Sequence, residues 1–191
     1  DMQMFHCLTG NRAVIDAEAH KAGARVVESV PRVYTCGRLI KLDGRWGQWV
    51  MLGDSEKNAT HVWVPFLGSH QAINTAIVER ICHELNKANF PVSELDFQEG
   101  LSAVKFPGRF EIIGGNPLTI RDGAHNPAAA EALALTLDEF SAPRPRTLVA
   151  GLLVTKDAEG FLAAMAPAID RVVATSSPHP FSRTADDVRR I

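Results

Sequence analysis

The segment from Arg109 onward alternates between two kinds of sequence. Short runs rich in β-branched and aromatic residues, which predict strands, are separated by longer runs rich in alanine and leucine, which predict helices. This alternation favours an α/β fold with a parallel, right-handed sheet. Strands are predicted over residues 110–113, 118–122, 147–153 and 171–176, and helices over residues 126–140 and 157–169.

The preceding part of the chain has a different pattern. Asp43-Gly44 stands between two alternating segments, which predicts a β-hairpin over residues 38–52. An apolar residue recurs at every fourth position from Ile73 to Leu85, which predicts a long helix. We therefore expect a strand-rich, partly antiparallel region that ends at Pro107-Gly108. Its predicted helices cover residues 11–23, 67–90 and 93–104, and its other predicted strands cover residues 24–30 and 61–67.

The composition argues against several classes of protein. The 191 residues suffice for one or two domains, and 46% hydrophobic with 22% charged residues is ordinary for a soluble globular protein. A net charge of −2 gives no reason to expect nucleic acid or a membrane surface as a partner. No apolar run reaches the roughly 18 residues of a membrane span, and residues 1–10 do not resemble a signal peptide. Cys7, Cys36 and Cys82, an odd set without metal-binding spacing, predict reduced thiols in a cytoplasmic protein.

Asp122 and His125 stand at the junction between a predicted strand and a predicted helix. Ligands of open α/β sheets bind beyond the carboxyl ends of strands and near helix N-termini, whose N–H groups attract phosphate. A carboxylate there can accept hydrogen bonds from ribose hydroxyls, and a histidine can donate to phosphate or carry a proton. The two small residues between them let a ligand approach the backbone. Asn126 and Pro127 also suit a helix start, so a purely structural role stays open for this turn.

Five motifs resemble those of one enzyme family, in the same order along the chain. That family is folylpolyglutamate synthase/dihydrofolate synthase, within the Mur-type ATP-dependent ligases. The resemblance covers nearly the whole chain, and the combination of three of the motifs is specific where each alone is weak. The motifs are LGSHQAIN (67–74), FPGRFEII (106–113), DGAHNP (122–127), GLLVTKD (151–157) and, more loosely, PFSRTADDV (180–188).

The resemblance implies a fold and an activity. Residues 1–105 are expected to be the C-terminal part of a Mur-type central ATP-binding domain, and residues 106–191 a Rossmann-like C-terminal ligase domain, incomplete at both ends. The implied enzyme adds L-glutamate to folate, to dihydropteroate, or to both, through an acyl phosphate formed with ATP. ATP and Mg²⁺ are the implied cofactors, small molecules the partners, and a monomer the implied state.

The resemblance also assigns roles to individual residues. Asn74 matches an asparagine that recognises adenine, and His70 lies one helical turn earlier on the same face. Arg109 matches an arginine that contacts the ATP phosphates, and Asp122 matches an aspartate that contacts ATP through the ribose. His125 matches a catalytic motif histidine near the reacting phosphoryl group or glutamate. Lys156 and Asp157 match groups that hold the glutamate carboxylate. Without the resemblance, a solvated amide is the better explanation of Asn74, and a surface arginine is the commoner fate of a residue such as Arg109. A helix cap with a solvated lysine explains Lys156 and Asp157 about as well as a ligand contact does.

The sequence also departs from the family. Full-length members carry a phosphate-binding loop with a Gly-Lys pair, and no such pair occurs in this chain. The family's magnesium ligands are expected upstream of the matched motifs, and no metal ligand is assigned here. The strand before Lys156 lacks the first acid of the family's D-K-D. The chain does not begin with Met, and we expect it to be a part of a ligase that is inactive on its own.

Two other functions remain alternatives. A cell-wall Mur-type amino-acid ligase shares the superfamily, but the His70-Gln71 pair favours the folate enzymes because cell-wall ligases usually carry His-Asn there. A non-catalytic α/β nucleotide-binding module is the alternative from a different functional class. The sequence upstream of this chain would separate the alternatives by the presence or absence of a phosphate-binding loop.

Overall fold

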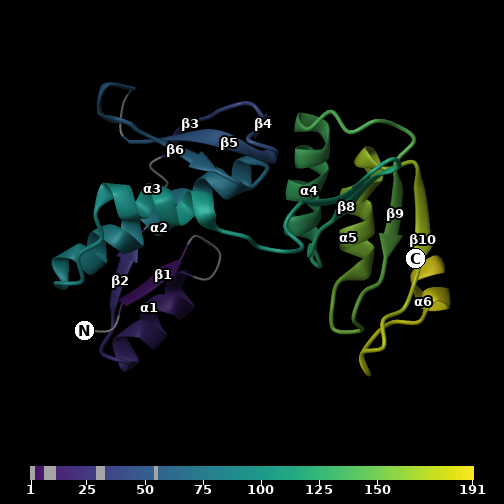
Figure 1. Ribbon diagram of the computed structural model, residues 1–191. Helices are drawn as coiled ribbons and strands as arrows, with labels where there is room; N and C mark the ends of the chain where they lie inside the picture. The colour runs from purple at the N-terminus through teal and green to yellow at the C-terminus, as the bar shows by residue number, and fades with distance from the viewer. Residues whose placement is uncertain (1–2, 7–11, 29–32, 54–55) are drawn as a thin grey trace. The chain divides into compact units, whose positions relative to one another are not determined.

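The computed structural model describes residues 3–6, 12–28, 33–53 and 56–191 (Figure 1). They form two compact units, each of which is described by itself. The main part of the second unit begins at Lys105, next to the expected boundary at Pro107-Gly108; the assignment of residues 1–105 and 106–191 to two ligase domains stays a prediction. The first unit contains Gln48–Pro65, Gln71–Val104 and the described residues up to Gly37, and the second contains Arg38–Gly47, Phe66–His70 and Lys105–Ile191.

The first unit begins with a parallel pair of strands. β1 (Gln3–His6) pairs with β2 (Arg25–Glu28), and α1 (Arg12–Lys21) connects them in the chain. Gly23 follows the helix at a φ of +64°, a left-handed conformation that favours glycine. The predicted helix over residues 11–23 and the predicted strand over residues 24–30 are confirmed over the described residues as α1 and β2, and β1 was not predicted. Parts of both predicted ranges, residues 11, 29 and 30, lie outside the described residues, as does Cys7.

An antiparallel sheet lies mostly in this unit, although its segment Arg38–Gly47, which includes the hairpin turn, belongs to the second unit. The predicted hairpin is confirmed: Asp43 and Gly44 have φ values of 48° and 81°, as a two-residue turn of type I′ requires. β5 carries the core of the sheet, with Val50 and Leu52 buried. β3 is an addition to the predicted strands. The strands are β3 (Val33–Cys36), β4 (Ile40–Leu42), β5 (Arg45–Leu52) and β6 (Thr60–Val64), and β5 pairs with the other three.

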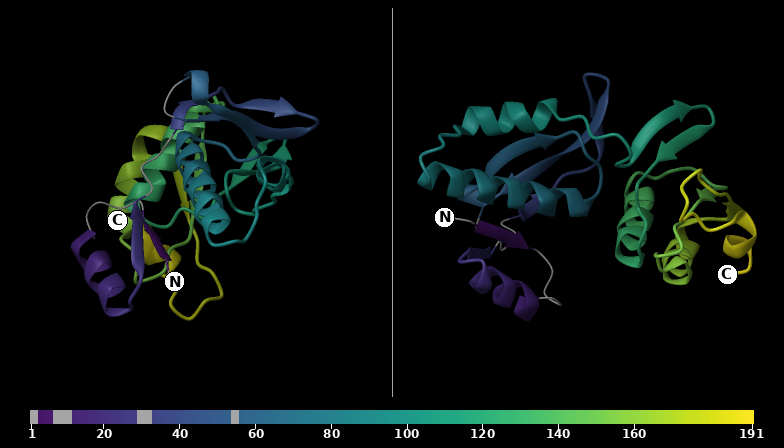
Figure 2. Two further views of the ribbon diagram at one scale, coloured as in Figure 1. Left: turned by 90° about the vertical axis from the view of Figure 1, so that its left-hand side faces the viewer. Right: turned by 90° about the horizontal axis from the view of Figure 1, so that it is seen from below.

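Two helices follow this sheet in the chain, and the first of them lies between the sheet and the β1–β2 pair (Figures 1 and 2). They are α2 (Ser69–Lys87) and α3 (Glu94–Ala103), and both confirm predicted helices. α2 buries small residues, including Ala72 and Ala76, whereas Ile73 and Leu85 are each 39% exposed. A four-residue repeat drifts around a helix of 3.6 residues per turn, so the predicted apolar row is only partly buried.

The second unit combines an antiparallel ribbon with a small parallel sheet. The predicted strands and helices are confirmed, but one expectation is wrong: β8 does not continue a parallel sheet and pairs antiparallel with β7. The physical reason is the short GGNP connection, which is too short for a parallel crossover. The short helix α6 is an addition. The elements are β7 (Glu111–Gly115), β8 (Leu118–Arg121), α4 (Pro127–Glu139), β9 (Thr147–Ala150), α5 (Ala158–Met165), the 3₁₀ turn Ala166–Ala168, β10 (Arg171–Ala174) and α6 (Ala185–Arg189).

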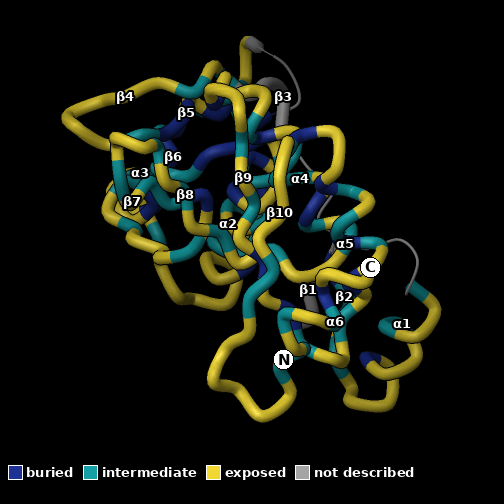
Figure 3. The backbone as a smooth tube through the Cα atoms, turned by 90° about the vertical axis from the view of Figure 1, so that its right-hand side faces the viewer, coloured by how far each residue is buried: buried dark blue, intermediate teal, exposed yellow. Residues whose placement is uncertain are grey.

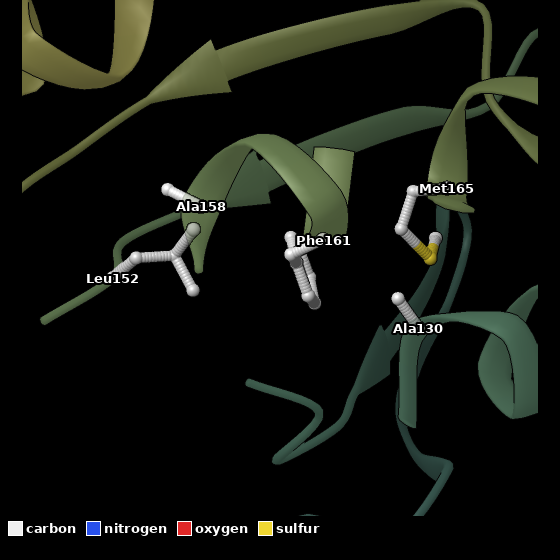
Figure 4. Close-up of a cluster of buried hydrophobic side chains, with 5 residues drawn as sticks. All are labelled: Ala130, Leu152, Ala158, Phe161 and Met165. Carbon is white, nitrogen blue, oxygen red and sulfur yellow. The ribbon is translucent and has the colours of Figure 1, made fainter. Parts of the chain in front are cut away.

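The core of the second unit lies where α4 and α5 pack side by side against β9 and β10 (Figure 1). β9 and β10 are parallel, with Thr147 opposite Arg171. Several residues of these two strands are exposed, as the yellow stretches of Figure 3 show, and Val149 is 65% exposed. The buried cluster of Figure 4 consists of Ala130, Leu152, Ala158, Phe161 and Met165.

Candidate nucleotide-binding site

Two motif segments of the second unit are tied together through their backbones. The N–H of Gly123 donates to the carbonyl of Gly108 over 2.8 Å. One carboxylate oxygen of Asp122 accepts from the N–H of Phe110 and the other from the N–H of Ala124, both over 2.7 Å. The loop that carries Arg109 and the turn that follows β8 therefore form one rigid structure.

Arg109 lies between two residues with left-handed backbones. Gly108 has a φ of 75°, which glycine adopts readily, and Phe110 has a φ of 44°, which is uncommon for a bulky residue. Phe110 is only 5% exposed, and its ring lies 5.4 Å from the ring of Phe140. Phe140 also contacts Trp46 of the β4–β5 hairpin, at 4.8 Å between ring centroids. Burial of the ring and the hydrogen bond to Asp122 together hold the strained backbone in place.

The guanidinium of Arg109 rests on small and aromatic neighbours. It lies 5.4 Å from the centroid of the Phe106 ring, a cation–π contact. A Cβ at Gly123 would come within 3.3 Å of Arg109 Nη1, so only glycine leaves the guanidinium its room without a shift. The side chain of Arg109 is exposed, and its charge can therefore reach a ligand.

His70 shares the electrostatic environment of Asp122 and Arg109. It is half-buried at the start of α2, in the short segment that belongs to the second unit. Burial lowers the pKa of the His70 imidazole; the Asp122 carboxylate opposes that lowering, and the Arg109 guanidinium adds to it. Gly68, at a φ of +103°, brings this segment against α4: a Cβ there would collide with the Thr136 hydroxyl and lie 2.9 Å from His70 Nδ1. The structure thus brings three of the predicted site residues together.

His125 and Asn126 occupy the turn before α4. His125 is exposed, and its Nδ1 lies 2.9 Å from the carbonyl oxygen of Gly123. A carbonyl only accepts, so Nδ1 carries the hydrogen, and Nε2 bears the lone pair in the neutral ring. Asn126 is the N-cap of α4, with Oδ1 accepting from Ala129 N over 2.9 Å. The expectation that Asn126 and Pro127 shape the helix start is confirmed.

Lys156 and Asp157 lie at the start of α5, at the same end of the second unit as His125. Asp157 caps α5 by accepting from the N–H of Gly160 over 2.9 Å, and Lys156 is half-buried. Arg183 holds this loop by hydrogen bonds, because its Nη2 donates to the carbonyls of Val154 and Lys156 over 3.4 Å and 3.3 Å. The sequence does not predict these hydrogen bonds of Arg183; its only sequence signal is the arginine of the loosely matching PFSRTADDV motif.

Asn74 belongs to the first unit. It is exposed on α2, one turn after His70, and its Nδ2 donates to Gln71 Oε1 over 3.0 Å. Two residues of the HQxxN motif therefore contact each other through their side chains. A common ligand for Asn74 and the second-unit residues stays a prediction.

The described residues offer neither a metal site nor a membrane span. Over residues 3–6, 12–28, 33–53 and 56–191, no three His, Cys, Asp or Glu side chains are grouped as metal ligands. Within the same ranges, none of the helices is long and apolar enough to cross a bilayer. Cys82 is a free, half-buried thiol.

Comparisons with known proteins give similarities along the chain. Residues 108–191 match the family described as Mur ligase, glutamate ligase domain. The chain is 32% identical over 181 residues to folylpolyglutamate synthase from Lacticaseibacillus casei, covering 89% of this chain and 39% of that protein. It is 33% identical over 170 residues to dihydrofolate synthase/folylpolyglutamate synthase from Mycobacterium tuberculosis, covering 87% of this chain and 34% of that protein.

A solved structure shows the same arrangement of elements. The structure is Mycobacterium tuberculosis folylpolyglutamate synthase complexed with ADP, with a TM-score of 0.75 and 26% identity over 98% of this chain and 41% of that one. The chain therefore spans 34–41% of the length of these three relatives. It belongs to the folylpolyglutamate synthase/dihydrofolate synthase family, and its residues 108–191 match the glutamate ligase domain of the Mur-type ligases.

Proposed function

We propose that this chain is part of an ATP-dependent ligase that joins L-glutamate to folate, to dihydropteroate, or to both. The observation that carries the proposal is the loop of Arg109, which backbone hydrogen bonds hold against the Asp122 turn and whose guanidinium is within electrostatic range of His70. The names of the relatives support the substrates, and the relative complexed with ADP supports the nucleotide.

Arg109 is the proposed phosphate ligand. A guanidinium forms paired hydrogen bonds with phosphate oxygens and keeps its charge at any physiological pH. Glycine at position 123 leaves space beside the Arg109 guanidinium, because a Cβ there would lie 3.3 Å from Arg109 Nη1. The residues present therefore fit a nucleotide, and ATP supplies the energy of the amide bond through an acyl phosphate.

Asp122 and Asn74 are the proposed contacts of the nucleoside. Each oxygen of Asp122 already accepts one backbone N–H, but a carboxylate oxygen has two lone pairs and can accept a ribose hydroxyl as well. The structural role of Asp122 and its proposed ribose contact are thus compatible. The carboxamide of Asn74 offers both a donor and an acceptor to the adenine edge.

His125, Lys156 and Asp157 are proposed to serve the incoming glutamate. An attacking amine must be neutral, and the Nε2 lone pair of neutral His125 can take its proton. Lys156 supplies a positive charge for a glutamate carboxylate, whereas the carboxylate of Asp157, which also caps α5, suits the amino group. In this proposal, Lys156 binds the glutamate carboxylate and Asp157 binds the amino group.

Magnesium is expected in the enzyme, but the described residues do not fit a magnesium site, and no step is assigned to the metal here. The sequence has no Gly-Lys pair of a phosphate-binding loop, so we propose that the chain by itself does not turn over. A monomeric, cytoplasmic protein remains our proposal for its state and location.

The proposed function is tested with a chimera. The matched segment of the Lacticaseibacillus casei relative is replaced by this chain, and incorporation of labelled glutamate into folate is measured with ATP present. Incorporation that requires ATP is expected, and the isolated chain should release no phosphate with the same substrates. A folded chimera that binds ADP without ligating glutamate would support the non-catalytic nucleotide-binding module instead. Ligation by the isolated chain would contradict its proposed inactivity.

A further inference from the structure

The carboxylate of Glu111 holds the loop that carries Arg109. Glu111 Oε2 accepts from the backbone N–H of Gly108 over 2.8 Å. The same oxygen accepts from Nε and Nη2 of Arg121 over 3.0 Å and 2.7 Å. Glu111 and Arg121 are partners in the β7–β8 register, so the antiparallel ribbon itself sets the position of the carboxylate.

Glu111 and Asp122 hold Arg109 from opposite sides. Glu111 fixes the peptide group before Gly108, and Asp122 fixes the N–H of Phe110. Between them, the carbonyl of Gly108 accepts from Gly123 N. A turn with left-handed residues on both sides of Arg109 would otherwise be free to relax, and the direction of the guanidinium would change with it.

We propose that Glu111 is a positioning residue that directs the Arg109 guanidinium toward the nucleotide phosphates. The inference rests on the proposed function, because it assumes that Arg109 binds phosphate. The hydrogen bond from Gly108 and then the pairing with Arg121 lower the pKa of the Glu111 carboxyl, so the group is ionised at neutral pH. Glu111 itself does not contact substrate in this assignment.

Stability alone is a poor explanation of this ion pair. The side chains of Arg121 and Glu111 are 56% and 33% exposed, and pairs this accessible contribute little to the free energy of unfolding. Fixing a long arginine side chain before a ligand arrives, by contrast, strengthens binding because less freedom is lost on association. A change at Glu111 should therefore affect the ligand more than the fold.

Another ion pair of the second unit offers a matched control. Asp170 also accepts a backbone N–H, from Arg146, and pairs with an arginine, Arg144, each over 2.6 Å. Its side chain is 33% exposed, the same fraction as that of Glu111. The two carboxylates therefore have the same kinds of partners and the same exposure, and only Glu111 lies next to Arg109.

The test compares Glu111→Ala, Glu111→Gln and Asp170→Ala in the full chain. The measurements are the ¹H–¹⁵N heteronuclear NOE of Arg109 Nε, which reports its order, and the affinity for ADP. Glu111→Ala should lower the NOE to that of exposed arginines and weaken ADP binding by about fivefold. Glu111→Gln, whose amide oxygen can still accept from Gly108, should restore most of both, and Asp170→Ala should change neither.

An unchanged Arg109 NOE in Glu111→Ala would overturn the inference, whatever happens to ADP. An equal loss of ADP affinity in Asp170→Ala would overturn it as well, because a general loss of stability would then suffice. If the wild-type chain does not bind ADP while the Arg109 NOE still depends on Glu111, the proposed function fails and the positioning of Arg109 by Glu111 stands. The two failures are thus distinguishable.

Discussion

The backbone of Gly160, in the first turn of α5, lies directly against the ring of Pro127, the first residue of α4. A Cβ at Gly160 would come within 2.8 Å of Pro127 Cγ and would collide with the Asp157 carboxylate. The absence of a side chain at position 160 lets the starts of the two helices meet. This contact puts the His125 turn and the Lys156 loop at the same end of the second unit.

Gly160→Ala should therefore destabilise the protein although alanine is the better helix former. Overpacking of this kind costs about 1–3 kcal/mol, and chemical denaturation measures it as a fall in the unfolding midpoint. Gly100→Ala is the control: that glycine is inside α3, and a Cβ there meets nothing within 4 Å. It should gain roughly 0.5–1 kcal/mol. A neutral or stabilising Gly160→Ala would show that the two helix starts do not meet in this way.

Much of the fold follows from local sequence signals. Ser93, Asn126 and Asp157 each begin a helix as predicted, because a capping side chain acts on N–H groups within its own turn. Asp43-Gly44 predicts its hairpin for a similar reason. The expected parallel position of β8 was wrong because β8 pairs with β7 across the short GGNP turn and not with a strand beyond α4.

The site could be predicted only in part. The motif wording selects Asp122 and Arg109, but it does not reveal that Asp122 holds the backbone of Phe110, a contact across 12 positions in sequence. Glu111 and Arg183 lie within the matching motifs FPGRFEII and PFSRTADDV, but the motifs do not show that these side chains bind backbone N–H and carbonyl groups. Such supporting residues can be identified only from a structure, which shows the contacts between the loops.

Asp122→Asn should weaken both the fold and the site. An amide retains one accepting oxygen, so either Phe110 N or Ala124 N loses its partner, at a cost of about 1–3 kcal/mol. ADP affinity should fall as well. Asn126→Ala removes a cap and should cost about 1 kcal/mol while leaving ADP affinity unchanged. Equal losses of ADP affinity in the two variants would argue against a nucleotide contact by Asp122.

Stability should depend on pH through His70. Its pKa is lowered in the folded protein, so the unfolded chain binds a proton first as the pH falls below about 6.5. The free energy of unfolding should decrease from that pH down to the lower folded pKa, and the contribution of His70 should then level off. In His70→Gln, the free energy of unfolding measured by denaturation should change less across this pH window. An identical pH profile in the variant would contradict the assignment.

Arg109→Lys should weaken ADP binding by about tenfold, because an ammonium keeps the charge but not the paired geometry. Isothermal titration at fixed salt measures the loss. Arg189→Lys, on the exposed surface of α6, is the matched control and should bind ADP like the wild type. Retention of full affinity in Arg109→Lys would mean that charge alone, and not the fork, serves the phosphates.

The proposed function requires that the carboxamide of Asn74, the guanidinium of Arg109 and the turn at Asp122 contact one and the same nucleotide. The most direct measurement is an NMR titration of the full chain with ADP that follows Asn74 Nδ2, Arg109 Nε and the Gly123 amide. If one nucleotide contacts all three groups, the three signals should shift along curves with a single dissociation constant, and Arg109→Ala should weaken binding in all three curves together. Signals that shift with different constants, or a shift confined to one of the two units, would contradict it.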